Sequence, residues 1–131
     1  MIGLDTNILV RYIAQDDEQQ SPRANEILEN ELSADHRGFI GSVVLVELCW
    51  TLKRLYQVNR QNLSVILERL LRAEELSFEH QDEVWAALQL FRSSNVEFAD
   101  ALIGFVHKKY GCGITLTFDK AAGQSDLFAS P

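Results

Sequence analysis

Short apolar runs alternate with amphipathic segments along the chain, and this alternation constrains the fold more than any other feature. The short runs are residues 2–4, 38–41, 76–78 and 114–118. Strands that alternate with helices are typical of a mostly parallel sheet with helices on both faces. A chain of 131 residues has an ordinary size for one domain. We therefore predict a single α/β domain over residues 1–131, built as a three-layer α/β/α sandwich with a short, mostly parallel central sheet.

Six helices are expected, because apolar residues recur at helical spacing in the remaining segments. They cover roughly residues 7–15, 21–32, 43–56, 62–73, 82–91 and 98–110. Thr6 and Ser42 have hydroxyl groups suited to cap the first and third of these helices. We expect the acidic residues 16–18 to be solvated loop and first-turn residues that complement the dipole of the second helix. No clear strand pattern follows Asp119.

The composition is acidic, with a formal net charge of -7 at pH 7. This charge argues against a protein that grips nucleic acid through a broad basic face, and it suits a basic protein partner. Cys49 and Cys112 are isolated, so a zinc site is not expected, and both are predicted to be buried thiols. No apolar stretch is long enough to span a bilayer, and the N-terminus lacks a basic region. We expect a cytoplasmic protein.

Four of the nineteen acidic residues stand in apolar surroundings rather than in polar stretches. Two follow predicted strands, and two lie in predicted helices; they are Asp5, Glu47, Asp100 and Asp119. A lone carboxylate in an apolar segment is costly unless a cation or a metal ion compensates it. Arg11 and Lys120 are each placed to neutralise one of them, which leaves the set as a whole uncompensated.

Each of these acids has an alternative explanation when it is considered alone. Asp100 can be a first-turn residue that meets the helix dipole, and Glu47 can belong to a buried ion pair. The four together favour a divalent metal site at the carboxyl edge of the sheet, where parallel strands bind ligands. Because all the donors are oxygen atoms, the set favours Mg²⁺ or Mn²⁺ over zinc.

The same residues resemble the PIN-domain family, and in particular the VapC-like toxins of bacterial toxin–antitoxin pairs. The resemblance covers nearly the whole chain, in order and spacing, and rests on Leu4-Asp5-Thr6-Asn7, on Glu47 in an apolar helix, on residues 98–103 (Phe-Ala-Asp-Ala-Leu-Ile), and on Thr117-Phe118-Asp119. It implies a PIN-like sandwich, cleavage of single-stranded RNA with Mg²⁺ or Mn²⁺, a homodimer, and inhibition by a cognate antitoxin protein.

Residue by residue, Asp5, Glu47, Asp100 and Asp119 match the acidic quartet of that family. Asp5 and Asp119 are expected to bind metal directly. Glu47 and Asp100 either bind metal directly, or act through water as a general base and a positioning group. Thr6 and Thr117 match the small hydroxyl positions beside the first and last acids, where they either bond to ligands or serve as a helix cap and strand filler.

Other folds and functions also bring acids to the edge of a parallel sheet. A haloacid-dehalogenase-type phosphatase needs a second Asp two residues after the first, where this chain has Asn7. A receiver domain needs an adjacent acidic pair at the end of its first strand, which this chain lacks. A catalytically weak or inactive PIN-fold module that binds RNA or protein is the remaining alternative to a ribonuclease.

Overall fold

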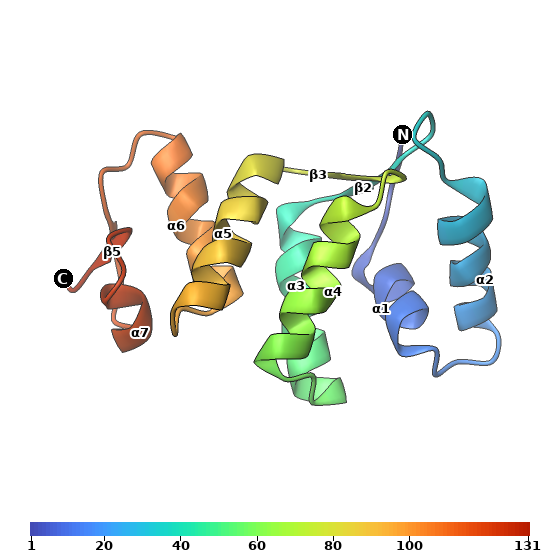
Figure 1. Cartoon of the computed structure of the whole chain (residues 1–131), viewed down its shortest axis with the longest axis horizontal. Coiled ribbons are helices and arrows are strands. Elements are labelled where there is room, and N and C mark those ends of the chain that lie inside the picture. The colour runs from blue at the N-terminus through green and yellow to red at the C-terminus, as the bar shows by residue number, and fades with distance from the viewer. The chain divides into compact units, whose positions relative to one another are not determined.

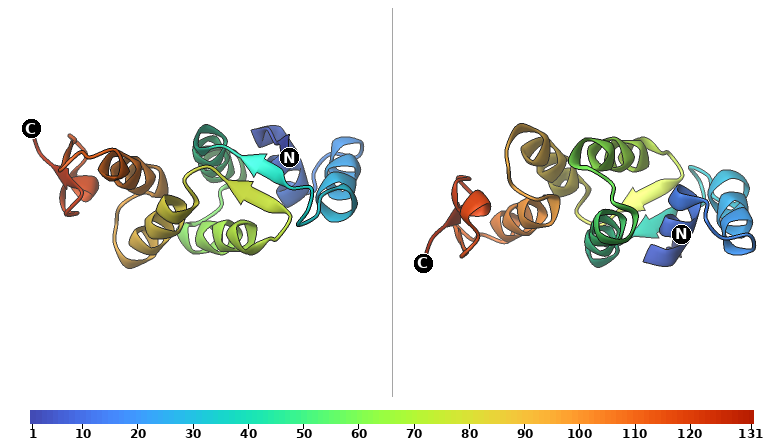
Figure 2. Two further views of the ribbon diagram at one scale, coloured as in Figure 1. Left: turned by 90° about the horizontal axis from the view of Figure 1, so that it is seen from above. Right: turned by 90° about the horizontal axis from the view of Figure 1, so that it is seen from below.

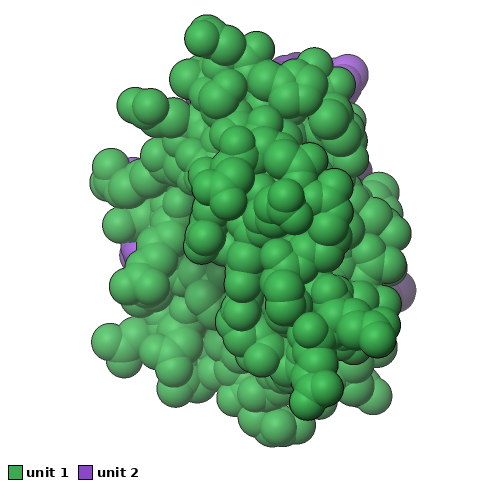
Figure 3. Space-filling model, turned by 90° about the vertical axis from the view of Figure 1, so that its right-hand side faces the viewer, with its two compact units in different colours: residues 1–79 green, residues 80–131 purple.

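The computed structural model describes all 131 residues, which form two compact units. Unit 1 comprises residues 1–79 and unit 2 comprises residues 80–131 (Figure 3). Each unit contains helices and a small parallel sheet (Figure 1). The predicted α/β class with a short parallel sheet is therefore confirmed, in agreement with a PIN-like α/β/α architecture.

The sheet of unit 1 has three strands in the order β1-β2-β3. They are β1 (Ile2–Gly3), β2 (Gly38–Ile40) and β3 (Leu76–Phe78), and both pairings are parallel. Figure 2 shows β2 and β3 side by side. Gly38 pairs with Ile2 on one side and with Leu76 on the other. The chain leaves β1 at the carboxyl edge of this sheet, and Asp5 follows the strand after one residue, Leu4.

Unit 1 contains four α-helices and one π-helical turn. These elements are α1 (Thr6–Ala14), α2 (Gln20–Glu26), the π-helix η1 (Ile27–Glu31), α3 (Ser42–Tyr56) and α4 (Arg60–Arg72). The helix expected over residues 21–32 thus changes to π-helical hydrogen bonding at Ile27. α1 contacts both α2 and α3, and α4 packs against β3. The core of this unit includes Leu9, Ile40, Leu48 and Leu67, each at most 1% exposed.

Unit 2 contains three helices and a two-stranded parallel sheet. Its elements are α5 (Gln81–Ser93), α6 (Phe98–Lys109), β4 (Thr115–Leu116), α7 (Lys120–Gly123) and β5 (Phe128–Ala129). α5 and α6 form the main packing contact, where the rings of Phe91 and Phe98 meet edge to face. The segment after Asp119, which shows no strand pattern, does form a strand, because β5 pairs with β4.

Two predicted helix caps are wrong. The N-cap of α1 is Asp5, not Thr6, and the Asp5 carboxylate accepts from the Thr6 amide at 2.8 Å. The N-cap of α3 is Gly41, and the Ser42 amide donates to the Glu79 carboxylate at 2.8 Å. In both helices the residue before the expected cap has the extended backbone of a true N-cap, so the hydroxyl residue becomes the first helical residue.

Three further expectations concern exposure and membranes. Cys49 is buried as predicted, whereas Cys112 is exposed, because it follows Gly111 in the turn after α6 and is not in a strand. Neither cysteine forms a disulfide. None of the helices combines the length and the apolar character needed to cross a membrane.

Candidate functional site

Asp5 and Glu47, which are 42 positions apart in the sequence, line one pocket of unit 1. The pocket has a volume of about 260 Å³. Its wall is built by the start of α1 and by one face of α3, since positions 47, 51 and 55 are spaced at four residues. The lining residues are Asp5, Thr6, Asn7, Val10, Arg11, Glu47, Thr51, Leu55 and Tyr56.

Asp5 is held by its position between a strand and a helix. The strand β1 ends at Gly3, Leu4 is buried, and Asp5 takes an extended backbone before α1 begins. The Asp5 side chain is exposed and bonds to the first amide of the helix. Next to it, Thr6 is only 6% exposed, and its hydroxyl oxygen has no hydrogen-bond partner in the protein. A buried hydroxyl without a partner is unusual and is consistent with a ligand at this pocket.

Glu47 is exposed, so the expectation that its carboxylate is buried in an apolar helix is wrong. The reason is that the apolar residues one turn away on its own face of α3 are exposed as well. Val43 is 80% exposed and Trp50 is 55% exposed. The buried face of α3 is formed instead by Leu45, Leu48, Cys49 and Leu52. Glu47 therefore presents its carboxylate to solvent and to the pocket.

Arg11 does not neutralise Asp5 or Glu47, although it lines the same pocket. Its Nη1 donates to Asp16 at 3.1 Å and to the Tyr56 hydroxyl at 3.4 Å, and its Nε donates to Gln20 at 2.8 Å. The phenol of Tyr56 in turn donates to Asp16 at 2.6 Å, and this bond is the main cause that holds the pKa of the Asp16 carboxyl below its usual value. The two acids of the pocket are thus left without an ion pair to a protein cation.

Asp100 and Asp119 interact within unit 2. Asp100 lies in the first turn of α6 and is half-buried, and Asp119 is the exposed N-cap of α7. Burial raises the pKa of the Asp100 carboxyl, and the negative charges of Asp119 and Glu97 raise it further. Carboxylates that repel each other in this way favour a cation between them.

The backbone around Asp119 is fixed by two short-range hydrogen bonds. Its carboxylate accepts from the Ala122 amide at 2.8 Å, and its own amide donates to the Thr117 hydroxyl at 3.0 Å. Thr117 thus supports the turn that carries Asp119, and this accounts for a hydroxyl residue at its position. Lys120 is exposed and forms no ion pair with Asp119.

The structure thus groups the four predicted site residues as two pairs, Asp5 with Glu47 and Asp100 with Asp119. Neither unit by itself contains three or more His, Cys, Asp or Glu side chains arranged to hold a metal ion. Each pair consists of oxygen donors, and neither pair is neutralised by a lysine or arginine. The donor chemistry and the raised pKa of Asp100 fit a hard divalent cation such as Mg²⁺ or Mn²⁺.

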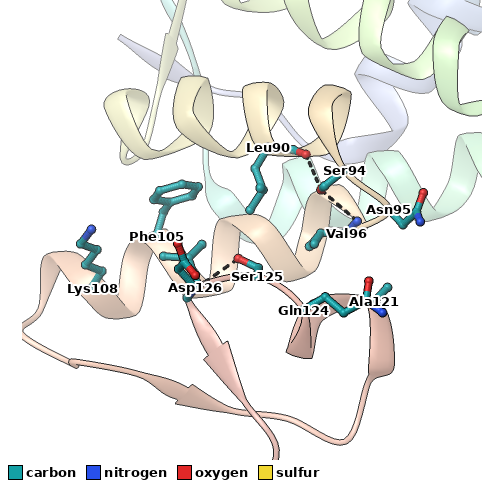
Figure 4. A pocket seen from close by; sticks show the side chains of 11 residues that line it. Leu90, Ser94, Asn95, Val96, Phe105, Lys108, Ala121, Gln124, Ser125 and Asp126 are labelled. Carbon is teal, nitrogen blue, oxygen red and sulfur yellow. Dashed lines mark hydrogen bonds between the residues drawn. The ribbon is translucent and has the colours of Figure 1, made fainter.

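A pocket of about 560 Å³ in unit 2 contains none of the four acids. α5, α6 and the segment from α7 to β5 form its walls (Figure 4). Polar groups from Asn95, Lys108, Gln124 and Asp126 line it together with apolar ones. No feature of this pocket points to metal or phosphate chemistry, since Lys108 is its only cation and Asp126 its only acid.

Sequence reasoning missed the part of the site that comes from α1 and α3 beyond the acids. Asn7 and Arg11 are four residues apart on α1, and Thr51 and Leu55 continue the face of Glu47 on α3. This four-residue spacing could have indicated from the sequence that the residues of each pair share a helix face. The contact of Tyr56 with Asp16 has no comparable signal, because the two residues are 40 positions apart.

Two comparisons with known proteins bear on the identity of the chain. A family model described as PIN domain matches residues 2–126, which include all four acids and most of both units. No curated protein matches the sequence.

Proposed function

Because the chain belongs to the PIN domain family, whose members are generally metal-dependent nucleases, we propose that it is an endoribonuclease that hydrolyses phosphodiester bonds of RNA with Mg²⁺ or Mn²⁺. The observation that carries the proposal is the occurrence of two acidic pairs, Asp5 with Glu47 and Asp100 with Asp119, that no lysine or arginine neutralises. We further propose that the whole chain acts as one PIN domain.

Asp5, Glu47, Asp100 and Asp119 are each proposed to serve metal-dependent cleavage. When bound, such an ion polarises the scissile phosphate and acidifies a water molecule. Asp5 and Asp119, which follow strands β1 and β4, are proposed as direct ligands. Glu47 and Asp100 are proposed either as further metal ligands, or as residues that act through water. In the second case one would serve as the general base that accepts a proton from the water molecule, and one would position that water molecule. The unpartnered hydroxyl of Thr6 supports a role in orienting a ligand beside Asp5.

The biological role is proposed to be that of a toxin in a type II toxin–antitoxin system, acting in the cytoplasm as a homodimer. Two observations support a protein partner such as an antitoxin. The net charge of -7 suits a partner with basic side chains. The helices α3 and α4 also expose apolar side chains, with Leu55 at 65% and Val65 at 40%. A hydrophobic helix is a common partner for such a surface.

The proposed activity is tested by measuring cleavage of single-stranded RNA by the wild type and by Asp5→Asn. We expect the wild type to cleave RNA with Mg²⁺ or Mn²⁺ and to stop when EDTA is added, because the carboxylates need a cation to act on phosphate. Asp5→Asn keeps the shape of the side chain and its bond to the Thr6 amide, but removes the charge. Its cleavage rate is expected to fall at least a hundredfold without loss of folded structure.

The matched control is Asp17→Asn. The Asp17 carboxylate also accepts from backbone amides just before and at the start of a helix, those of Gln19 and Gln20, but Asp17 does not line the pocket. We expect its activity to equal that of the wild type. Cleavage by Asp5→Asn at the wild-type rate would contradict the assignment of Asp5. RNA binding by the wild type without any metal-dependent cleavage would instead identify a binding module.

A further inference from the structure

We propose that Arg11 binds a backbone phosphate of the single-stranded RNA substrate, next to the phosphate that is cleaved. This inference rests on the proposed ribonuclease function. It assigns a substrate-positioning role to a residue outside the acidic quartet, on the same pocket as Asp5 and Glu47.

Arg11 lies at one end of the pocket that contains Asp5 and Glu47. It lies on α1, one turn and a half after Asp5, and it is the only lysine or arginine that lines the pocket. Its side chain is 31% exposed, so part of it remains accessible. The remaining wall beside it contains Asn7, Thr51 and Tyr56, which add neutral polar groups. A substrate chain that lies across Asp5 and Glu47 therefore meets one cation at this end of the pocket.

The guanidinium group of Arg11 is only partly occupied by partners within the protein. Asp16, Gln20 and Tyr56 occupy Nε and both hydrogens of Nη1. Nη2 has no hydrogen-bond partner in the protein, so two N–H donors of a fixed group are left for a ligand. The bond from Tyr56 to Asp16 closes the network and limits the freedom of the arginine. A guanidinium that is already oriented loses less conformational entropy when it binds a phosphate oxygen.

The charge of the protein makes a cation in the pocket important for binding RNA. A protein with a net charge of -7 repels RNA at a distance, and the two acids of the pocket repel phosphate nearby. A metal ion compensates the scissile phosphate but not its neighbours along the strand. A charge-assisted bond from Arg11 would bind one neighbouring phosphate. Such a contact is made in the ground state as well as in the transition state, so it lowers KM rather than raising kcat.

Arg23 is a matched control on the neighbouring helix α2. Its Nη1 pairs with Glu26 and Glu31, and its Nη2 also reaches Glu31, at 3.3 Å. Both ends of this guanidinium are thus occupied by carboxylates, and Arg23 does not line the pocket. Arg11→Gln and Arg23→Gln are matched, because each removes from unit 1 one positive charge that belongs to an arginine with an ion pair.

The experiment measures KM and kcat for cleavage of a short single-stranded RNA by the full chain and its variants. In Arg11→Gln we expect KM to rise about tenfold with kcat within about twofold, as for loss of one hydrogen bond to a charged group. Arg11→Lys should raise KM several-fold, because a single amine cannot bond to Asp16 and to phosphate through separate nitrogens. Arg23→Gln should match the wild type.

RNA binding can also be measured directly in the Asp100→Asn variant, which is expected not to cleave the RNA. The same RNA is titrated with Mg²⁺ present at several salt concentrations. Adding Arg11→Gln should weaken binding and reduce the slope of log K against log salt by about 0.7, the value for one phosphate contact on a single strand. Adding Arg23→Gln should leave this slope unchanged. A purely structural role for Arg11 would lower the melting temperature but would not change the slope.

The inference would be overturned if Arg11→Gln had the same KM and the same salt slope as the wild type. It would also be overturned if Arg23→Gln changed KM and the salt slope as much as Arg11→Gln does. If circular dichroism shows that Arg11→Gln does not fold, Arg11→Lys is the variant that tests the inference. A KM equal to that of the wild type in Arg11→Lys would then overturn the inference. If Asp100→Asn cleaves RNA as fast as the wild type, the proposed function itself is wrong and the inference falls with it. An inactive Asp100→Asn with a normal Arg11→Gln refutes only the role of Arg11.

Discussion

Asp119 has a structural contact as well as its proposed metal contact, and substitutions can separate the two. As the N-cap of α7 its carboxylate accepts from the Ala122 amide at 2.8 Å. Asp119→Asn keeps an oxygen acceptor at this place but removes the charge, because Asn is as good an N-cap as Asp. Asp119→Ala removes both. We therefore expect both variants to lose RNA cleavage, and only the alanine variant to lose stability as well.

The size of the stability loss follows from the environment of the cap. Loss of an N-cap acceptor costs about 1 kcal/mol in a typical helix. Ala122 is completely buried, so its amide would lose its partner in a place poorly reached by water. The cost should therefore lie nearer ~2 kcal/mol. For a chain of this length, each kcal/mol corresponds to a change of about 4 °C in melting temperature. Asp119→Asn should remain within about 0.5 kcal/mol of the wild type.

The assay combines urea denaturation in EDTA with metal-dependent cleavage of single-stranded RNA. Asn59→Ala is the control, because Asn59 caps α4 through the Asn62 amide at 2.8 Å and has no proposed role in chemistry. It should lose about 1 kcal/mol of stability and keep its activity. Equal stability of Asp119→Ala and Asp119→Asn would refute the argument on capping. A loss of activity in Asn59→Ala as large as in Asp119→Asn would show that destabilisation, not lost charge, stops cleavage.

Two further predictions concern unit 2. Burial and the charges of Asp119 and Glu97 raise the pKa of Asp100, so the folded state binds this proton more tightly than the unfolded state. The wild type without metal should thus lose stability as pH rises from the usual aspartate pKa through the raised one, and Asp100→Asn should escape that loss. Urea denaturation in EDTA at pH 4 and pH 7 measures this, and an equal difference between the two proteins at both pH values would contradict it. Gly104→Ala should destabilise by about 1 kcal/mol despite the better helix propensity of alanine, because the new Cβ would lie 2.9 Å from Cε2 of Phe128. Thermal melting measures the loss of stability, with Gly113→Ala as the control because no atom lies within 4 Å of a Cβ added at Gly113. A Gly104→Ala protein as stable as the wild type would mean that Phe128 moves aside at little cost in free energy.

Much of the fold follows from local patterns in the sequence. The strand Leu76–Phe78 is predicted with its observed bounds, and the helices that contain Glu47 and Asp100 are predicted to within one residue at each end. These segments have clear periodicity and clear breaks. The strand Phe128–Ala129 was not predicted, because two residues carry no periodic pattern and owe their conformation to pairing with Thr115 and Leu116.

The common pocket of Asp5 and Glu47 was expected from the sequence, but the residues around these two acids were not. Asp5 and Glu47 share a pocket as strand-end and helix reasoning led us to expect. The argument from burial was wrong for Glu47, because an apolar stretch of sequence such as Val43 to Val46 does not reveal which of its faces is covered. The role of Arg11 depends on Asp16, Gln20 and Tyr56, and no pattern in the sequence connects Tyr56 to the other two.

Three of the four acids stand at the beginnings of helices: Asp5 and Asp119 as N-caps, and Asp100 in a first turn. Amide groups at a helix start carry partial positive charge, which stabilises a nearby carboxylate. Asp5 and Asp119 thus accept hydrogen bonds from the Thr6 and Ala122 amides, whereas Asp100 has no such bond and burial raises its pKa. The segments that carry Asp5 and Asp119 are therefore held in place by hydrogen bonds within the protein itself.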